Sequence, residues 1–202
     1  MLWRFVQALV AALAVVAAVF FLAAPGYQEA SMNRIVPAAI KVTDQARALH
    51  KTLAIADLHS DTLMWKRDVL DRGTRGHVDL PRLIDGHVAL QVFSSVTKSP
   101  KGQNYDSNSE HADDNITPLA IAQMQPVRTW SSLLERSLWH AEKAREASAT
   151  SGGKLVLVSS QKELRGLIAA RKAGAGAPVG ALLSIEGLHN LEGKRENLDV
   201  LF

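Results

Sequence analysis

Cysteine is absent from the 202-residue sequence. This absence excludes a disulfide scaffold, a zinc site ligated by thiolates and a lipid-modified cysteine, and it leaves the redox compartment open. A concentration of positive charge is also missing, because 23 Lys and Arg are scattered among 20 Asp and Glu. We therefore expect no nucleic-acid partner. Any metal site must use histidine and carboxylate side chains, and the length allows at most one sizeable soluble domain.

One long apolar run lies near the N-terminus. Residues 5–24 contain Gln7 as their only polar side chain, and Pro25 follows them. A helix of about 20 residues crosses the roughly 30 Å hydrocarbon core of a bilayer, whereas the apolar part of a cleavable signal peptide is about 7 to 15 residues long. The run therefore predicts an uncleaved membrane anchor over residues 1–26, with a cleaved signal peptide as the alternative.

A short polar motif follows the next apolar stretch. The segment Ile55–Thr62 places Asp57, His59 and Asp61 at alternate positions. In an extended strand such positions share one face, so the three polar groups are expected to converge. Imidazole and carboxylate are ligands that zinc accepts. The alternative is a strand running into a polar turn, but a histidine between two carboxylates on one face has no role in turn chemistry.

Apolar segments alternate with helical patterns in the rest of the chain. Strands are expected at residues 53–56, 88–96, 154–158 and 179–185. Helices are expected at residues 36–52, 79–85, 118–149 and 160–173, and a polar loop at residues 98–115. Each strand is a near-continuous apolar run, which is typical of a parallel sheet covered by helices. The predicted fold class is therefore α/β.

A second carboxylate stands where the last of these strands ends. Glu186 follows the apolar segment 179–185. In parallel α/β folds the carboxyl ends of the strands and the loops after them hold the site chemistry. Glu186 is therefore expected on the same rim as His59 and Asp61. A solvated acid in a turn is the alternative.

These motifs resemble a known family. The segments Asp57–Asp61 and Ile185–His189 are similar to the ligand motifs of the membrane dipeptidase family, also called renal dipeptidase, of zinc metallopeptidases. The segments Gly76–Leu83 and Val88–Ser94 resemble the link between the first two strands of that family. The resemblance extends from about Ile55 to the C-terminus.

The resemblance implies a (β/α)8 barrel with two zinc ions that hydrolyses dipeptides, and sometimes related amide or lactam bonds, with a metal-activated water. Carried over to this sequence, His59 and Asp61 bind one zinc ion and Glu186 bridges both. Asp57 orients the ligands without binding metal, and His189 has a role in packing or at the rim. The resemblance assigns no further catalytic residue within this chain.

The role of His77 is left open. Four other histidines are expected to be solvated or packed: His50, His87, His111 and His140.

The sequence also departs from the family pattern. The family's remaining ligands are histidines on later strands, and the chain from Leu53 onward has 150 residues, against about 250 for an eight-stranded barrel. We therefore expect residues 53–202 to be the N-terminal half of a (β/α)8 barrel, preceded by a linker and a leading helix at 27–52. Exposed strand edges predict that these residues alone are inactive and aggregate or form a homodimer.

Three functions are compatible with these motifs. The leading hypothesis is a single-pass, membrane-anchored zinc dipeptidase with its catalytic domain outside the cytoplasm. The second is a non-catalytic, membrane-anchored binding or interaction module derived from the barrel. The third, a metal-dependent hydrolase with a His-x-His motif, is disfavoured because residue 61 is aspartate.

Overall fold

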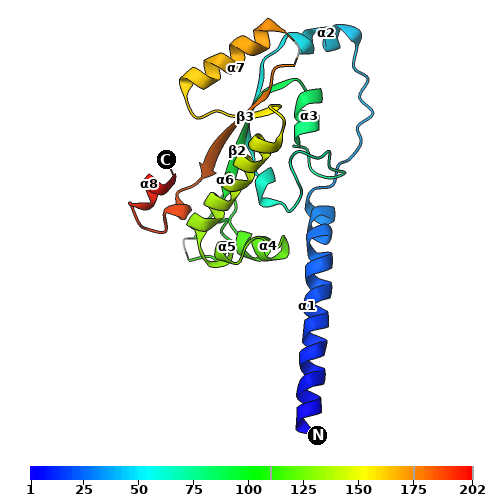
Figure 1. The fold of residues 1–202 in the computed structure, drawn as a ribbon, viewed down its shortest axis with the longest axis vertical. Coiled ribbons are helices and arrows are strands. Elements are labelled where there is room, and N and C mark those ends of the chain that lie inside the picture. Colours follow the sequence, from blue (N-terminus) through cyan, green and yellow to red (C-terminus); the bar gives the residue numbers. More distant parts are fainter. Residues whose placement is uncertain (110, 175, 202) are drawn as a thin grey trace.

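A long N-terminal helix projects from an α/β domain (Figure 1). The computed structural model describes residues 1–109, 111–174 and 176–201. At the centre of the domain lies a four-stranded sheet in which every pair of neighbouring strands is parallel. The predicted α/β class with a parallel sheet is confirmed.

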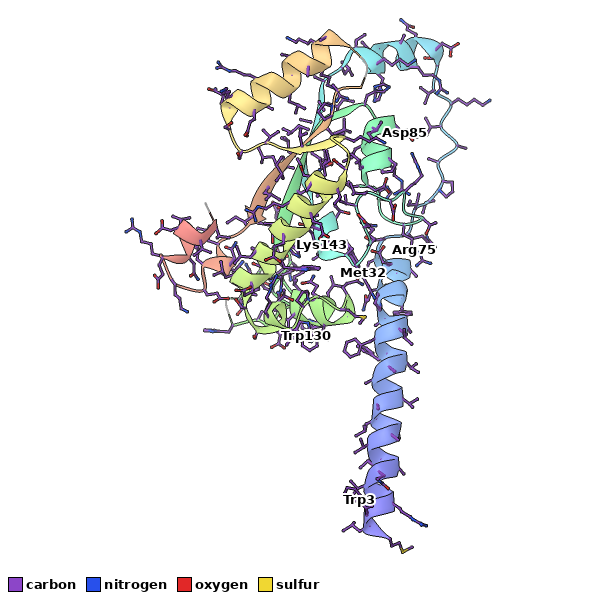
Figure 2. All side chains as sticks on the ribbon, viewed as in Figure 1. Trp3, Met32, Arg75, Asp85, Trp130 and Lys143 are labelled. Atoms are coloured by element: carbon purple, nitrogen blue, oxygen red, sulfur yellow. The ribbon has the colours of Figure 1, made fainter. Side chains whose placement is uncertain are left out.

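Helix α1 (Leu2–Met32) is longer than the apolar run that predicted it. The side chains of residues 2–20 are exposed and point away from the helix on all sides (Figure 2). The helix does not end at Pro25, because an internal proline removes only one backbone donor and the turns after it contact the domain. Buried Gln123 donates from Nε2 to the carbonyl of Pro25 at 3.4 Å, for example.

The sheet consists of β1 (Ile55–Ser60), β2 (Val88–Val96), β4 (Val179–Glu186) and β3 (Leu155–Leu157), in that spatial order. The four strands lie where the sequence predicts them, although β1 begins two residues late and continues to Ser60.

The strand order differs from the chain order. A barrel with sequential strands would place β3 between β2 and β4, but here β4 pairs directly with β2. This pairing is continuous over seven residues, from Leu90↔Gly180 to Val96↔Glu186. The three residues of β3 pair only with the beginning of β4 and therefore form an edge.

The helices of the domain lie before and between the strands. Their bounds are α2 (Asp44–Thr52), α3 (Leu80–Asp85), α4 (Ile116–Ala122), α5 (Arg128–Ser131), α6 (Leu133–Thr150), α7 (Gln161–Ala173) and α8 (Asn197–Leu201), with short 3₁₀ turns η1 (Thr62–Met64) and η2 (His189–Leu191).

Two helix predictions were wrong in their extent. The helix expected from residue 36 begins only at α2, because the side chain of Thr43 accepts a hydrogen bond from the amide of Ala46 and caps it. The helix expected over 118–149 is three helices. Pro126 interrupts it after α4, and Ser132 caps α6 by accepting from the amide of Glu135.

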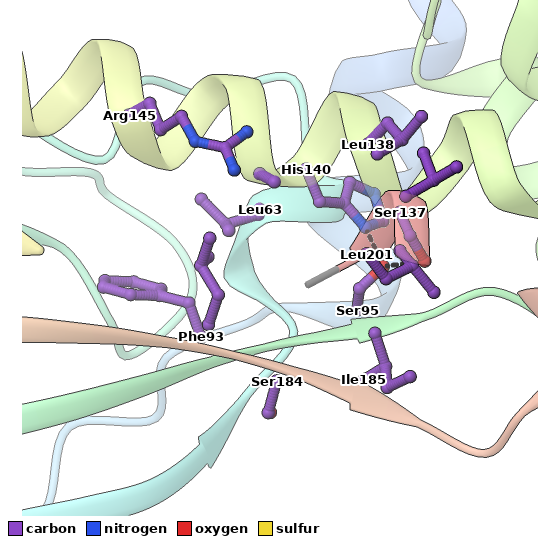
Figure 3. A pocket seen from close by; sticks show the side chains of 13 residues that line it. Leu63, Phe93, Ser95, Ser137, Leu138, His140, Arg145, Ser184, Ile185 and Leu201 are labelled. Carbon is purple, nitrogen blue, oxygen red and sulfur yellow. Dashed lines mark hydrogen bonds between the residues drawn. The ribbon is translucent and has the colours of Figure 1, made fainter. Parts of the chain in front are cut away.

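Helix α6 covers one face of the sheet, and a cavity of about 190 Å³ remains beneath it. Figure 3 shows Ser137 and His140 of α6 directed toward Ser95 of β2 at this cavity. His140 Nδ1 lies 2.7 Å from Ser95 Oγ, and Ser95 Oγ donates to Ser137 Oγ at 3.2 Å. The cavity wall is therefore partly polar.

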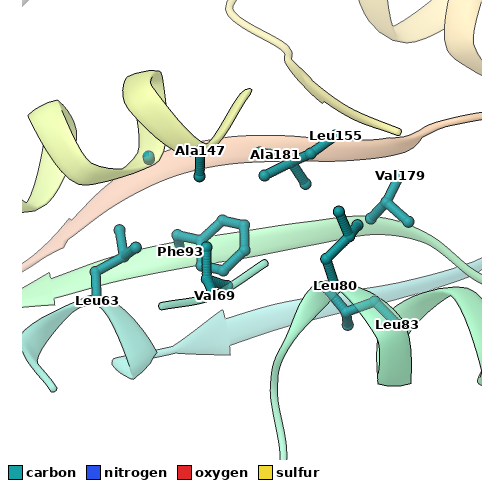
Figure 4. Close-up of a cluster of buried hydrophobic side chains, with 10 residues drawn as sticks. Leu63, Val69, Leu80, Leu83, Phe93, Ala147, Leu155, Val179 and Ala181 are labelled. Carbon is teal, nitrogen blue, oxygen red and sulfur yellow. The ribbon is translucent and has the colours of Figure 1, made fainter. Parts of the chain in front are cut away.

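The main hydrophobic core lies on the same face (Figure 4). It contains residues from η1, the loop after it, α3, α6, β2, β3 and β4: Leu63, Val69, Leu80, Leu83, Phe93, Ala144, Ala147, Leu155, Val179 and Ala181. Because β2 and β4 contribute to this core, packing fixes the two strands that set the position of Glu186.

Candidate metal centre

Three polar side chains converge at the carboxyl ends of two strands. His59 lies in β1, Asp61 follows that strand directly, and Glu186 is the last residue of β4. His59 Nε2 lies 3.3 Å from Asp61 Oδ2 and 3.2 Å from Glu186 Oε2. One potential ligand atom from each residue lies within 4.8 Å of the other two. We call these three residues the carboxylate–histidine cluster.

The sheet brings these distant residues together. Strand β2 lies between β1 and β4, and parallel pairing aligns the carboxyl ends of all three. Glu186 pairs with Val96 at the last position of β2. A carboxylate and an imidazole that are far apart in the sequence thereby meet across the end of β2.

The backbone of the Asp57–Asp61 motif is not a regular strand. Asp57 pairs with Gln91 and Ser60 with Phe93, so three steps along β1 correspond to two steps along β2. The register shift interrupts the strict alternation of side chains that a regular strand would have. Convergence of His59 and Asp61 therefore depends on this irregularity and on the turn into η1.

Asp61 is the most buried member of the cluster. Its side chain is 30% exposed. Burial raises the pKa of Asp61 above its ordinary value of 3.8 and outweighs the nearby His59, which lowers it, while Glu186 adds to the increase. Its Oδ1 atom is buried and has no hydrogen-bond partner among the described residues. The nearby His59 therefore offsets the cost of burying this carboxylate only in part.

The other two members face solvent. The side chains of His59 and Glu186 are 52% and 53% exposed. Small molecules can therefore reach the cluster from solvent.

These residues fit a divalent metal ion. One imidazole nitrogen and two carboxylates form a ligand set that zinc accepts, and water or further ligands complete its coordination. The unpartnered Oδ1 of Asp61 is an additional observation, because a cation would supply the charge that this buried oxygen lacks. The two carboxylates would also repel each other less with a cation between them.

Asp57 lies outside the cluster. Its carboxylate accepts a hydrogen bond from the backbone amide of His59 at 3.2 Å. Its potential ligand atoms are not among those gathered within 4.8 Å. Asp57 can thus hold the backbone that carries His59.

The structure places the other histidines apart from the cluster. His189 begins η2 and is exposed, and the rings of His50 and His87 contact each other at 5.7 Å between centroids. His77 is exposed, whereas His140 is buried beneath α6. His111 lies in the polar loop and is exposed.

Sequence reasoning missed the polar group around His140. Burial lowers the pKa of His140 to about 3, with Lys143 and Arg136 adding to the decrease, so its ring is neutral at ordinary pH. Asn190 donates to Ser137 at 3.0 Å and joins this group to η2. No local sequence motif predicts these contacts, because they join residues that are far apart in the sequence.

Comparisons with known proteins agree with the motifs. A family model described as membrane dipeptidase (peptidase family M19) matches residues 43–202. A search of curated proteins finds no match. The solved structures include the dipeptidase AC, a metallopeptidase of family M19, at 18% identity and a TM-score of 0.41, over 74% of this chain. This chain spans 40% of the length of that dipeptidase.

The family match includes all three residues of the carboxylate–histidine cluster and all four strands of the sheet. It extends over most of the chain and leaves out α1 and the segment after it. The chain belongs to the membrane dipeptidase family of metallopeptidases, peptidase family M19.

Proposed function

We propose that this chain provides metal ligands for a zinc-dependent dipeptidase. The observation that carries the proposal is the meeting of His59, Asp61 and Glu186, with an unpartnered carboxylate oxygen among them. Membership of a dipeptidase family makes a dipeptide or a related small amide the proposed substrate. The exposed side of the cluster gives such a substrate access.

Each residue has a distinct proposed role. His59 and Asp61 would hold one ion, and Glu186, which has two carboxylate oxygens, would be shared between two. Asp57 holds the amide of His59 and so keeps the imidazole directed toward the cluster. When bound, two divalent ions supply Lewis-acid activation of water and of the scissile carbonyl.

The number of ligands sets a requirement. Zinc in a catalytic site takes about three protein ligands per ion, whereas the cluster offers three residues in total. Two ions therefore need further donors in addition to these three residues. We propose that the donors come from strands of a closed (β/α)8 barrel, in which β1, β2 and β4 form part of the wall.

We further propose that residues 1–26 anchor the protein in a membrane as a single span, with the domain outside the cytoplasm. Helix α1 has a mean hydropathy of 2.7 over its most apolar window, and none of that window is buried against the domain. Residues 27–52 connect this anchor to the barrel domain, residues 53–202.

Metal titration tests the proposed site. We expect Glu186→Gln and His59→Ala each to weaken zinc binding by this chain by at least about tenfold, because each variant removes one of the three clustered ligands. Binding is measured by calorimetry in detergent solution, with zinc counted by elemental analysis after gel filtration.

His189→Ala and Glu196→Gln serve as matched controls, because both residues are exposed and lie outside the cluster. Unchanged zinc affinity in Glu186→Gln would remove Glu186 from the ligand set.

A further inference from the structure

The domain meets α1 without a spacer. The apolar run ends at Ala24, and the next residue, Pro25, is buried against the domain. Its carbonyl accepts from Nε2 of Gln123, which directly follows α4 and is 1% exposed. On the next residue, the carbonyl of Gly26 accepts from Arg75 at 3.3 Å. The domain therefore begins where the apolar span ends.

A second set of contacts fixes the following turns of α1. Glu29 lies 3.5 Å from Arg67, and these side chains are only 14% and 18% exposed. Arg67 also donates to the carbonyl of Arg75 at 2.8 Å. The amide of Gly76 donates to the carbonyl of Asn33 at 2.7 Å, just after the helix ends. Contacts on three successive turns prevent the domain from swinging freely about α1.

This attachment determines which surface faces the proposed membrane. Figure 1 shows α4 and α5 at the end of the domain from which α1 projects, with α4 beside the upper part of α1. Trp130 of α5 lies at that end in Figure 2. The headgroup region adds only about 5 to 7 Å beyond the hydrocarbon on each side of a bilayer. A contact with Pro25 therefore places the end of α4 at headgroup depth.

The turn between α4 and α5 exposes apolar side chains at this level. Met124 is 45% exposed and Val127 is 71% exposed. We call residues 124–127 the Met124–Val127 turn. The amine of Lys66 lies 3.3 Å from the sulfur of Met124, which adds a cation beside the apolar surface. Apolar side chains flanked by lysine suit an interface between hydrocarbon and anionic or zwitterionic headgroups.

The backbone at Met124 supports a role for its side chain. Met124 has a φ of 56°, in the left-handed region, and follows Gln123, the C-cap residue of α4. Glycine or asparagine normally occupies this position, because a bulky side chain is strained there. Backbone strain and solubility would both favour glycine or asparagine over an exposed methionine at this position.

We propose that the Met124–Val127 turn, with Lys66, rests on the phospholipid surface of the same bilayer that α1 spans. This inference depends on the proposed anchoring by α1 and adds a second membrane contact made by the domain itself. The partner of the turn is a lipid surface because Gln123 joins the turn to α1, so that the turn lies at the depth in the bilayer where the apolar run of α1 ends. The domain would thus sit directly on the membrane.

Single cysteine variants test this contact cleanly, because the natural chain has no cysteine. Val127→Cys reports on the turn, and Leu13→Cys, at a position 60% exposed within the apolar run, reports on the span. Ile168→Cys is the control, since Ile168 is 38% exposed on α7, at the other end of the domain in Figure 1. Each full-length variant is labelled with a polarity-sensitive fluorophore and reconstituted in phosphatidylcholine vesicles with or without brominated acyl chains.

We expect bromine to quench the label at residue 127 several-fold more than the label at residue 168, and the label at residue 13 most strongly. A circular dichroism spectrum equal to that of the unmodified chain shows that the fold of each labelled variant is intact, and Met124→Cys repeats the measurement at a second position on the turn. Quenching at residue 13, with residues 124 and 127 no more quenched than residue 168, would overturn the contact and leave the anchor standing. Absence of quenching at residue 13 would overturn the anchor and the contact together.

Discussion

At the residue scale, Asp61 is a candidate metal ligand that lowers the stability of the metal-free protein. Its carboxyl is partly buried, one oxygen lacks a hydrogen-bond partner among the described residues, and Glu186 lies close to it. Each of these features disfavours the charged group in the metal-free protein. A hydrophobic or neutral residue would be easier to accommodate. The same features would become favourable when a cation binds.

Asp61→Asn is therefore expected to stabilise the metal-free protein and to abolish its stabilisation by zinc. We expect a gain of roughly 0.5 to 1 kcal/mol in the free energy of unfolding with chelator present. For the unmodified chain, zinc at 100 times its dissociation constant should add about 2.7 kcal/mol, and this increment should vanish in the variant. Thermal unfolding in detergent with and without zinc measures both.

Asp57→Asn is the matched control, because Asp57 is also half-buried and lies outside the cluster, and the asparagine oxygen can still accept the hydrogen bond from the amide of His59. It should retain most of the zinc increment. An Asp61→Asn variant that zinc stabilises as strongly as the unmodified chain would remove Asp61 from the ligand set.

At the scale of elements, the starts of α3 and α7 lie where the sequence predicts them. Ser160 and Glu163 form a capping box that opens α7, and Asp79 caps α3 by accepting from the amide of Arg82. Such signals act within one turn, so a single sequence contains them. The breaks at Pro126 and Ser132 were missed because an apolar helical pattern continues on both sides of them.

Contacts between elements were harder to predict. Adjacency of β2 and β4 results from seven consecutive pairs, and no property of either strand alone identifies its neighbour. The register shift between Asp57 and Ser60 depends likewise on pairing with β2. The sequence nevertheless placed His59, Asp61 and Glu186 on one rim, because parallel strands always align their carboxyl ends.

The attachment of α1 leads to a prediction about two elements. Glu29→Ala should loosen the end of α1 from the domain, because Arg67 loses its acidic partner there. We expect the amide of Gly76 to exchange its hydrogen about fivefold faster, which corresponds to roughly 1 kcal/mol. Hydrogen exchange followed by mass spectrometry measures this effect.

Amides within β2 and the exposed-site variant Glu196→Ala provide the controls for this experiment. Unchanged protection of Gly76 in Glu29→Ala would show that the ion pair does not hold the helix.

At the scale of the whole molecule, stability should fall in acid because of one core histidine. His140 is 1% exposed and its pKa is lowered to about 3, whereas an unfolded chain binds this proton near pH 6.5. Its neutral ring therefore contributes stability above pH 6.5, and this contribution is lost as the pH falls toward 3. The slope from this group approaches about 1.4 kcal/mol per pH unit.

His140→Gln should flatten the pH dependence of the unfolding midpoint between pH 6.5 and 4, because glutamine does not titrate and can still bond Ser95. The variant is expected to be less stable at pH 8 and to lose less on acidification. His77→Gln, at an exposed position, is the control. Equal slopes for the unmodified chain and His140→Gln would refute the assignment.

The direct attachment of the domain to α1, through Pro25, Gly26 and Glu29, has a mechanical consequence. A span longer than the local hydrocarbon thickness tilts to hide its excess length. With no hinge to absorb that rotation, the whole domain would lean as the helix leans. Bilayer thickness would then set the angle at which the exposed side of the carboxylate–histidine cluster faces the surrounding water.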